Sequence, residues 1–65
     1  MAGGGHVIIR GALRAAASLD IVKDNLPANK KARLEDVLEK SDGDWNDDET
    51  HFVRRCIGDA YDAVS

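Results

Sequence analysis

The stretch "NDDETHFVRRCIGDAYDAV", residues 46–64, has the most regular pattern in this chain of 65 residues. Its apolar side chains recur at steps of one and three residues, which is the spacing of an amphipathic helix. They are Phe52, Val53, Cys56, Ile57, Ala60, Tyr61 and Val64. Asn46 is a good N-cap, and Glu49 follows it at the position of a capping box. The pattern therefore predicts a helix over residues 46–64.

Two more helices are predicted upstream, over residues 7–25 and 27–41. Pro27 favours the boundary between them, because proline suits the first turn of a helix and disfavours helical geometry in the residue before it. In the second helix, an apolar face is formed by Leu34, Val37 and Leu38. In the first, an apolar stripe recurs at alternating steps of four and three residues. It contains Ile8, Ala12, Ala15, Leu19, Val22 and Leu26.

Glycines predict the structure of the N-terminal segment and of the turn before the last helix. Gly3 to Gly5 predict a flexible N-terminal segment over residues 1–5. Next to them, the letters "HVII" of residues 6–9 leave a short strand open as an alternative to helix. Residues 41–44 predict a turn in which Gly43 is available for a left-handed backbone.

These elements predict an all-α fold with a single domain over residues 6–65, either a small three-helix bundle or a helical hairpin. A chain this short is near the lower limit for folding without disulfides or metal. Nine of its hydrophobic residues are alanines, which bury little apolar surface. We therefore expect that a homo-oligomer or a bound partner completes the core.

Motifs of enzyme active sites are missing from the sequence. It has no Gly-rich phosphate loop, no nucleophile elbow and no His-Glu-x-x-His motif. We therefore expect neither an enzyme, nor a cofactor, nor a metal site. The single Cys56 cannot form an internal disulfide, and no signal peptide or membrane span is visible. This favours a soluble, cytoplasmic protein.

The stretch "DGDWNDDETHF", residues 42–52, is densely acidic. As a calcium loop it would lack the glycine at position 6 and the glutamate at position 12. Helix capping and the helix dipole explain the three acids at 47–49. They do not explain Asp42 and Asp44, which predict either a solvated acidic patch or a docking surface for a basic partner.

The distribution of charge favours a binding role. Residues 1–34 contain six basic and two acidic side chains, a net charge of +4, whereas residues 35–65 contain three basic and ten acidic ones, a net charge of −7. Such asymmetry steers association, including contact between copies. The predicted partner-binding residues are the acidic stretch and the outer side of the last helix, namely Asp42, Asp44, Trp45, Asp47, Asp48, Glu49, Arg54, Arg55, Gly58 and Asp62.

We therefore expect a small intracellular module that binds another protein, either as an adaptor or as an acidic inhibitor. The inhibitor would cover a basic surface, such as one that binds nucleic acid. The alternative is a dimeric, helix-turn-helix-like DNA-binding regulator that uses Lys30, Lys31, Arg33, Arg54 and Arg55. The acidic start of the last helix disfavours this alternative, because those residues would have to approach the DNA.

One segment, "LEDVLEKSDGDWNDDE" at residues 34–49, resembles part of the haemolysin-expression-modulating family. It spans about a quarter of the chain and is similar to that family's segment of helix, turn and helix start. Members of the family are small intracellular helical proteins that bind a nucleoid protein instead of reading bases themselves. The resemblance implies a binding role for this chain and assigns no functional residues, and the first predicted helix has no counterpart in it.

Overall fold

The computed structural model describes the backbone of residues 2–65 and the side chains of residues 10–65. Helices account for the whole fold of this range. These residues form four α-helices and one short 3-10 helix, with no strand among them. The elements are α1 (Ala2–Ala17), α2 (Asp20–Lys23), α3 (Ala28–Glu39), η1 (Asp42–Asp44) and α4 (Asp47–Val64). The predicted all-α class is confirmed, and residues 6–9 are helical instead of forming a strand.

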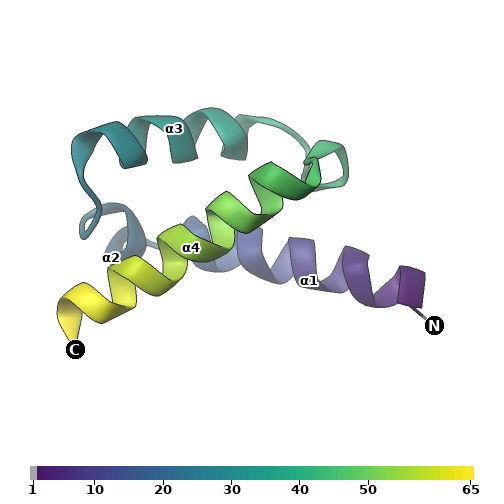
Figure 1. Cartoon of the computed structure of the whole chain (residues 1–65), viewed down its shortest axis with the longest axis horizontal. Helices are drawn as coiled ribbons and strands as arrows, with labels where there is room; N and C mark the ends of the chain where they lie inside the picture. Colours follow the sequence, from purple (N-terminus) through teal and green to yellow (C-terminus); the bar gives the residue numbers. More distant parts are fainter. Residues whose placement is uncertain (1) are drawn as a thin grey trace.

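Helix α4 packs against each of the other three α-helices. In Figure 1 it runs in front of α1 and α3, and its C-terminal end lies close to α2. The fully buried side chains of α4 all belong to the predicted apolar stripe, and they are Val53, Cys56 and Ala60. The last members of the stripe extend beyond the core, since Tyr61 is 42% exposed and Val64 is 48% exposed.

The predicted start of α4 is confirmed in detail. The Asn46 side chain accepts a hydrogen bond from the Glu49 backbone N–H (2.8 Å), and the Asn46 backbone N–H donates to the Glu49 carboxylate (3.0 Å). This reciprocal capping box satisfies two backbone donors that a helix start leaves without partners.

The first predicted helix, over residues 7–25, is wrong as a single element. The chain breaks at Ser18 and Leu19, which separate α1 from α2. Ser18 donates its hydroxyl hydrogen to the Arg14 backbone oxygen (2.8 Å), and Leu19 has an extended backbone (φ −71°, ψ 143°). The extended residue ends one helix and lets the next begin in a new direction.

This break redistributes the predicted apolar stripe. Val22 is fully buried, but Ala12, Ala15 and Leu19 are exposed, and Ala17, which is not part of the predicted stripe, is buried instead. A stripe predicted for one straight helix cannot stay on one face when the chain turns between two helices.

The core lies between α4 and the elements that it crosses. Its buried members are Ala17, Val22, Leu34, Val37, Trp45, Val53, Cys56 and Ala60. Leu34 and Val37 confirm the predicted apolar face of α3, and Leu38 packs against the core from its edge. In the described part of the chain, no helix combines the length and the apolar character needed to cross a bilayer.

The glycine segments differ from the prediction. Gly3 to Gly5, predicted to be flexible, lie within α1. Gly43 does not adopt a left-handed backbone, because no glycine in residues 2–65 has a positive φ. The α3–α4 connection is instead made by η1, which turns the chain without the special geometry of glycine.

Candidate functional site

Four of the predicted partner-binding residues form an exposed corner of the molecule, here called the acidic corner: Asp42, Asp44, Asp47 and Asp48. The first two belong to η1 and the other two to the first turn of α4. Only Asp42 is half-buried, and the other three are exposed. Among the described side chains, the corner makes one ion contact, between Arg10 and Asp47 at 4.0 Å, and the Asp47 side chain remains 97% exposed. The corner therefore presents most of its negative charge to solvent.

Trp45, predicted to bind a partner, lies beneath the acidic corner instead of on its surface. It is only 2% exposed, and its ring N–H donates to the Val37 backbone oxygen at 2.9 Å. The buried ring fixes the connection between η1 and α4 onto α3. In this conformation Trp45 supports the corner and is not available to a partner.

Glu49, also predicted to bind a partner, is occupied by contacts within the fold. Its carboxylate closes the capping box and pairs with the Lys40 ammonium at 2.6 Å, which leaves its side chain 15% exposed. The hydrogen bond from Lys40, and next the one from the Asn46 backbone, lowers the pKa of Glu49 below its ordinary value. Glu49 therefore links α4 to the end of α3 as an ionised group.

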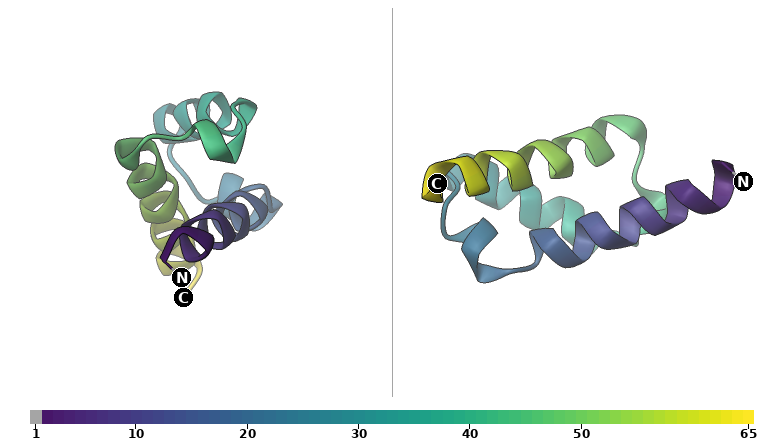
Figure 2. Two further views of the ribbon diagram at one scale, coloured as in Figure 1. Left: turned by 90° about the vertical axis from the view of Figure 1, so that its right-hand side faces the viewer. Right: turned by 90° about the horizontal axis from the view of Figure 1, so that it is seen from below.

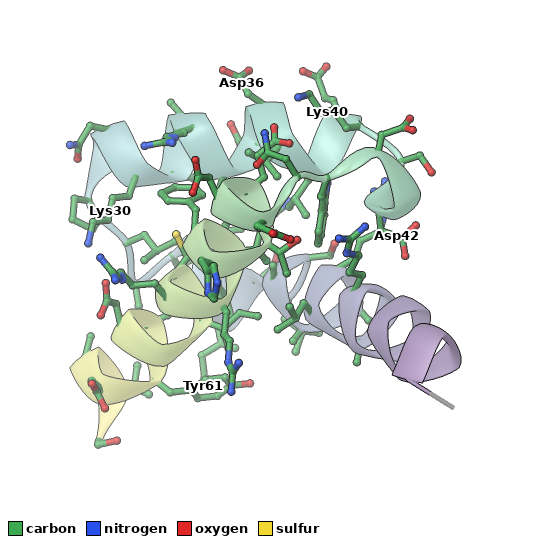
Figure 3. The ribbon with its side chains drawn as sticks, turned by 45° about the vertical axis from the view of Figure 1, so that its right-hand side comes forward. Lys30, Asp36, Lys40, Asp42 and Tyr61 are labelled. Carbon is green, nitrogen blue, oxygen red and sulfur yellow. The ribbon has the colours of Figure 1, made fainter. Side chains whose placement is uncertain are left out.

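Helix α1 supports the acidic corner from the other side. Arg14 donates a hydrogen bond to the Lys40 backbone oxygen, where the chain leaves α3. The Asp42 carboxylate lies against α1, since a Cβ at Gly11 would stand 3.5 Å from one of its oxygens. Figure 3 shows Asp42 at this junction, next to the ribbon of α1. The corner is thus held by α1, α3 and α4 together.

The remaining predicted residues, Arg54, Arg55, Gly58 and Asp62, share one side of α4, here called the outer face of α4. All four are exposed. In Figure 1 this helix lies in front of the others, and in the right-hand view of Figure 2 it forms the upper edge of the molecule. Arg54, Arg55 and Asp62 form no ion pair with another described side chain. The structure therefore leaves these four residues together on the exposed side of α4.

A groove between α3 and α4 was not predicted from the sequence. It has a volume of about 290 Å³ and is lined by Asn29, Lys30, Arg33, Phe52, Arg55 and Cys56. The Arg33 guanidinium lies over the Phe52 ring at 4.5 Å from its centroid, and Lys30 pairs with Asp59 at 2.9 Å. These partners are far apart in the sequence, so no local spacing signals their contact. The groove brings together three basic residues that the sequence grouped as possible DNA contacts: Lys30, Arg33 and Arg55.

Cys56 forms part of the groove wall but points into the core, where it is 1% exposed. Burial raises the pKa of its thiol, which keeps the sulfur protonated near neutral pH. A protonated thiol is a poor nucleophile, so this residue acts in packing. Among the described side chains, no three His, Cys, Asp or Glu residues lie close enough together to hold a metal ion.

Comparison with known proteins found no matching family model, no similar curated protein and no similar solved structure. The local resemblance of residues 34–49 therefore stays an expectation from the sequence.

Proposed function

We propose that this protein is a small helical module that binds another protein through the acidic corner, and that the partner presents a basic surface. The observation that supports this proposal is the fixed geometry of the corner. Trp45 is buried beneath it, the capping box holds the first turn of α4, and Arg14 bonds to the chain where α3 ends. A rigid acidic surface loses little conformational entropy when a partner binds.

Electrostatics points to the charge of the partner. Like charges repel, and the four carboxylates lie within seven positions of the chain. Neither Asp44 nor Asp48 has an ion-pair partner among the described side chains, although Asp48 lines a depression together with Arg33 and Arg55. Lysine or arginine side chains of a partner would relieve this repulsion. The helix dipole favours the charges on Asp47 and Asp48, but it does not favour those on η1. As an inhibitor, the corner would offer carboxylates to a surface that otherwise holds phosphates.

The test compares two variants that remove the same number of charges. Asp44→Asn with Asp48→Asn removes two of the four charges of the acidic corner, and Glu35→Gln with Asp36→Asn removes two charges from exposed residues of α3. Asp36 points away from the rest of the molecule in Figure 3. Proteins captured from an extract of the native host would be identified, purified and titrated against each variant.

We expect the corner variant to bind the captured partner about 5- to 30-fold more weakly, because two charge contacts are worth about 1–2 kcal/mol together. The α3 variant should bind like the wild type, and binding of both proteins should weaken with salt. Circular dichroism of each variant checks that the helices remain. Equal binding by the two variants would contradict a role for the corner.

A second candidate function is the binding of nucleic acid, which is favoured by the gathering of Lys30, Arg33 and Arg55 at one groove. Two carboxylates weaken this candidate, since Asp59 pairs with Lys30 and Asp48 lies in the adjoining depression. A shift of labelled duplex that weakens with salt and disappears with Arg33→Glu and Arg55→Glu would support it. Absence of a shift at low salt would count against it.

A further inference from the structure

The outer face of α4 is self-complementary about Gly58. Arg54 lies four residues before this glycine and Asp62 lies four residues after it, so all three share one side of the helix. A half-turn rotation about an axis through Gly58, perpendicular to the helix, reverses the direction of α4. The same rotation exchanges the positions of the basic and the acidic side chain.

We propose that two copies of this chain associate through the outer face of α4, with the two helices antiparallel and a twofold axis at Gly58. In this arrangement Arg54 of each copy faces Asp62 of the other copy. Tyr61 lies seven residues after Arg54, two helical turns along the same flank of α4, so Arg54 of each copy also lies beside Tyr61 of the other copy. Every contact then occurs twice, as an isologous interface requires. The proposal goes beyond the acidic corner and uses different residues.

Gly58 has no role within the monomer that requires glycine. A Cβ at this position would meet nothing within 4 Å, its backbone has no positive φ, and glycine is a poor helix former. At a crossing point between two helices, however, a missing side chain lets the two backbones approach closely. The dimer therefore gives a physical reason for a glycine that the monomer leaves unexplained.

The charges on α4 separate into those used within the monomer and those left for a partner. Glu49 pairs with Lys40, and Asp59 pairs with Lys30. By contrast, Arg54, Arg55 and Asp62 are exposed and have no ion-pair partner among the described side chains.

Tyr61 adds an aromatic surface beside these charges. It is 42% exposed, and in Figure 3 it projects from the side of α4 that lies away from α3. An arginine guanidinium binds favourably over the face of a tyrosine ring. In the antiparallel arrangement, Arg54 of the second copy lies on the flank of Tyr61 and supplies this cation.

The dimer should be weak, because one helix face buries less than the roughly 1,200 Å² that is typical of stable interfaces. We expect a dissociation constant on the order of 0.1 mM at low salt, increasing with ionic strength because the ion pairs are exposed. Sedimentation equilibrium of the full chain, from about 10 µM to about 1 mM, covers this range.

A charge-exchange series tests the geometry. Arg54→Asp alone and Asp62→Arg alone each place like charges opposite one another, so each variant should be monomeric up to about 1 mM. The double variant restores both pairs and should associate like the wild type. An equimolar mixture of the two single variants should also associate, because each pair then contains one acid and one base.

Gly58→Leu separates association from folding. A leucine at the crossing point should abolish the dimer, whereas its higher helix propensity should raise the midpoint of thermal unfolding by about 5 °C. A wild type that stays monomeric up to about 1 mM, or a dimer that persists in Arg54→Asp and in Gly58→Leu, would overturn the proposal. So would association that is lost with Asp44→Asn and Asp48→Asn but kept in Arg54→Asp, since it would place the contact at the acidic corner.

Discussion

Trp45 shows how one side chain can prepare a surface without being part of it. Its ring is buried between the η1–α4 connection and α3, and its only polar atom donates to Val37. The aspartates on either side of it in the sequence, Asp44 and Asp47, are exposed. The position of the acidic corner therefore depends on an apolar contact below it.

Trp45→Phe should lower the free energy of unfolding by about 1–3 kcal/mol, because the buried Val37 carbonyl loses its donor. Trp45→Ala should lower it by about 3–5 kcal/mol, which is close to the total stability of a small domain. Urea unfolding followed by far-UV circular dichroism measures both changes. Tyr61→Phe, at an exposed aromatic, is the control and should change stability by less than about 0.5 kcal/mol. Equal stability of Trp45→Phe and the wild type would show that the ring N–H contributes nothing.

The elements differ in how far the sequence predicts them. Helix α4 could be predicted with its cap because Asn46, Glu49 and the apolar stripe are all local signals. The break between α1 and α2 could not, because neither Ser18 nor Leu19 is a helix breaker and Leu19 makes no side-chain cap. That break is set by packing, which buries both Ala17 and Val22.

The same limit applies to the candidate site. The acidic corner could be predicted because its four residues lie within seven positions of the sequence, 42–48. Two of the residues predicted with it are not available on the surface, since tertiary contacts bury Trp45 and pair Glu49 with Lys40. The stacking of Arg33 on Phe52 in the groove is a contact between helices, for which local spacing holds no signal.

The junction between α3 and α4 should depend on pH through Glu49. Its pKa is lowered in the folded protein, so its contribution to stability is complete above the ordinary pKa of glutamate and is lost as the pH falls through the folded value. Glu49→Gln keeps an acceptor for the Asn46 N–H but loses the ion pair with Lys40. We therefore expect this variant to be less stable than the wild type at pH 7, with a difference that closes as the pH falls below about 4.

Urea unfolding at a series of pH values measures this closure. Asp36→Asn is the matched control, because Asp36 is exposed and forms no ion pair among the described side chains. Its stability difference from the wild type should stay small and nearly constant over the same range. A difference between Glu49→Gln and the wild type that persists unchanged at pH 3 would assign the effect to side-chain packing instead of charge.

The whole molecule has a small core for the surface that it exposes. Among residues 10–65, two of the eight buried residues are alanines, while Leu19, Ile21, Tyr61 and Val64 remain between 42% and 50% exposed. Domains of this size have little stability to spare. A partner or a second copy that binds only the folded chain therefore raises the free energy of unfolding by a noticeable fraction.

If the α4 dimer forms, thermal stability should depend on protein concentration. At a concentration about tenfold above the dissociation constant, association adds about 1.4 kcal/mol to the folded state, which corresponds to a rise in Tm of about 5 °C for a domain of this size. The wild type should therefore unfold at a higher temperature at about 1 mM than at about 10 µM. Arg54→Asp should unfold at the same temperature at both concentrations. Calorimetry of the two proteins measures this contrast. A wild-type Tm that does not change with concentration would contradict the dimer and would mean that the core of one chain is sufficient for its stability.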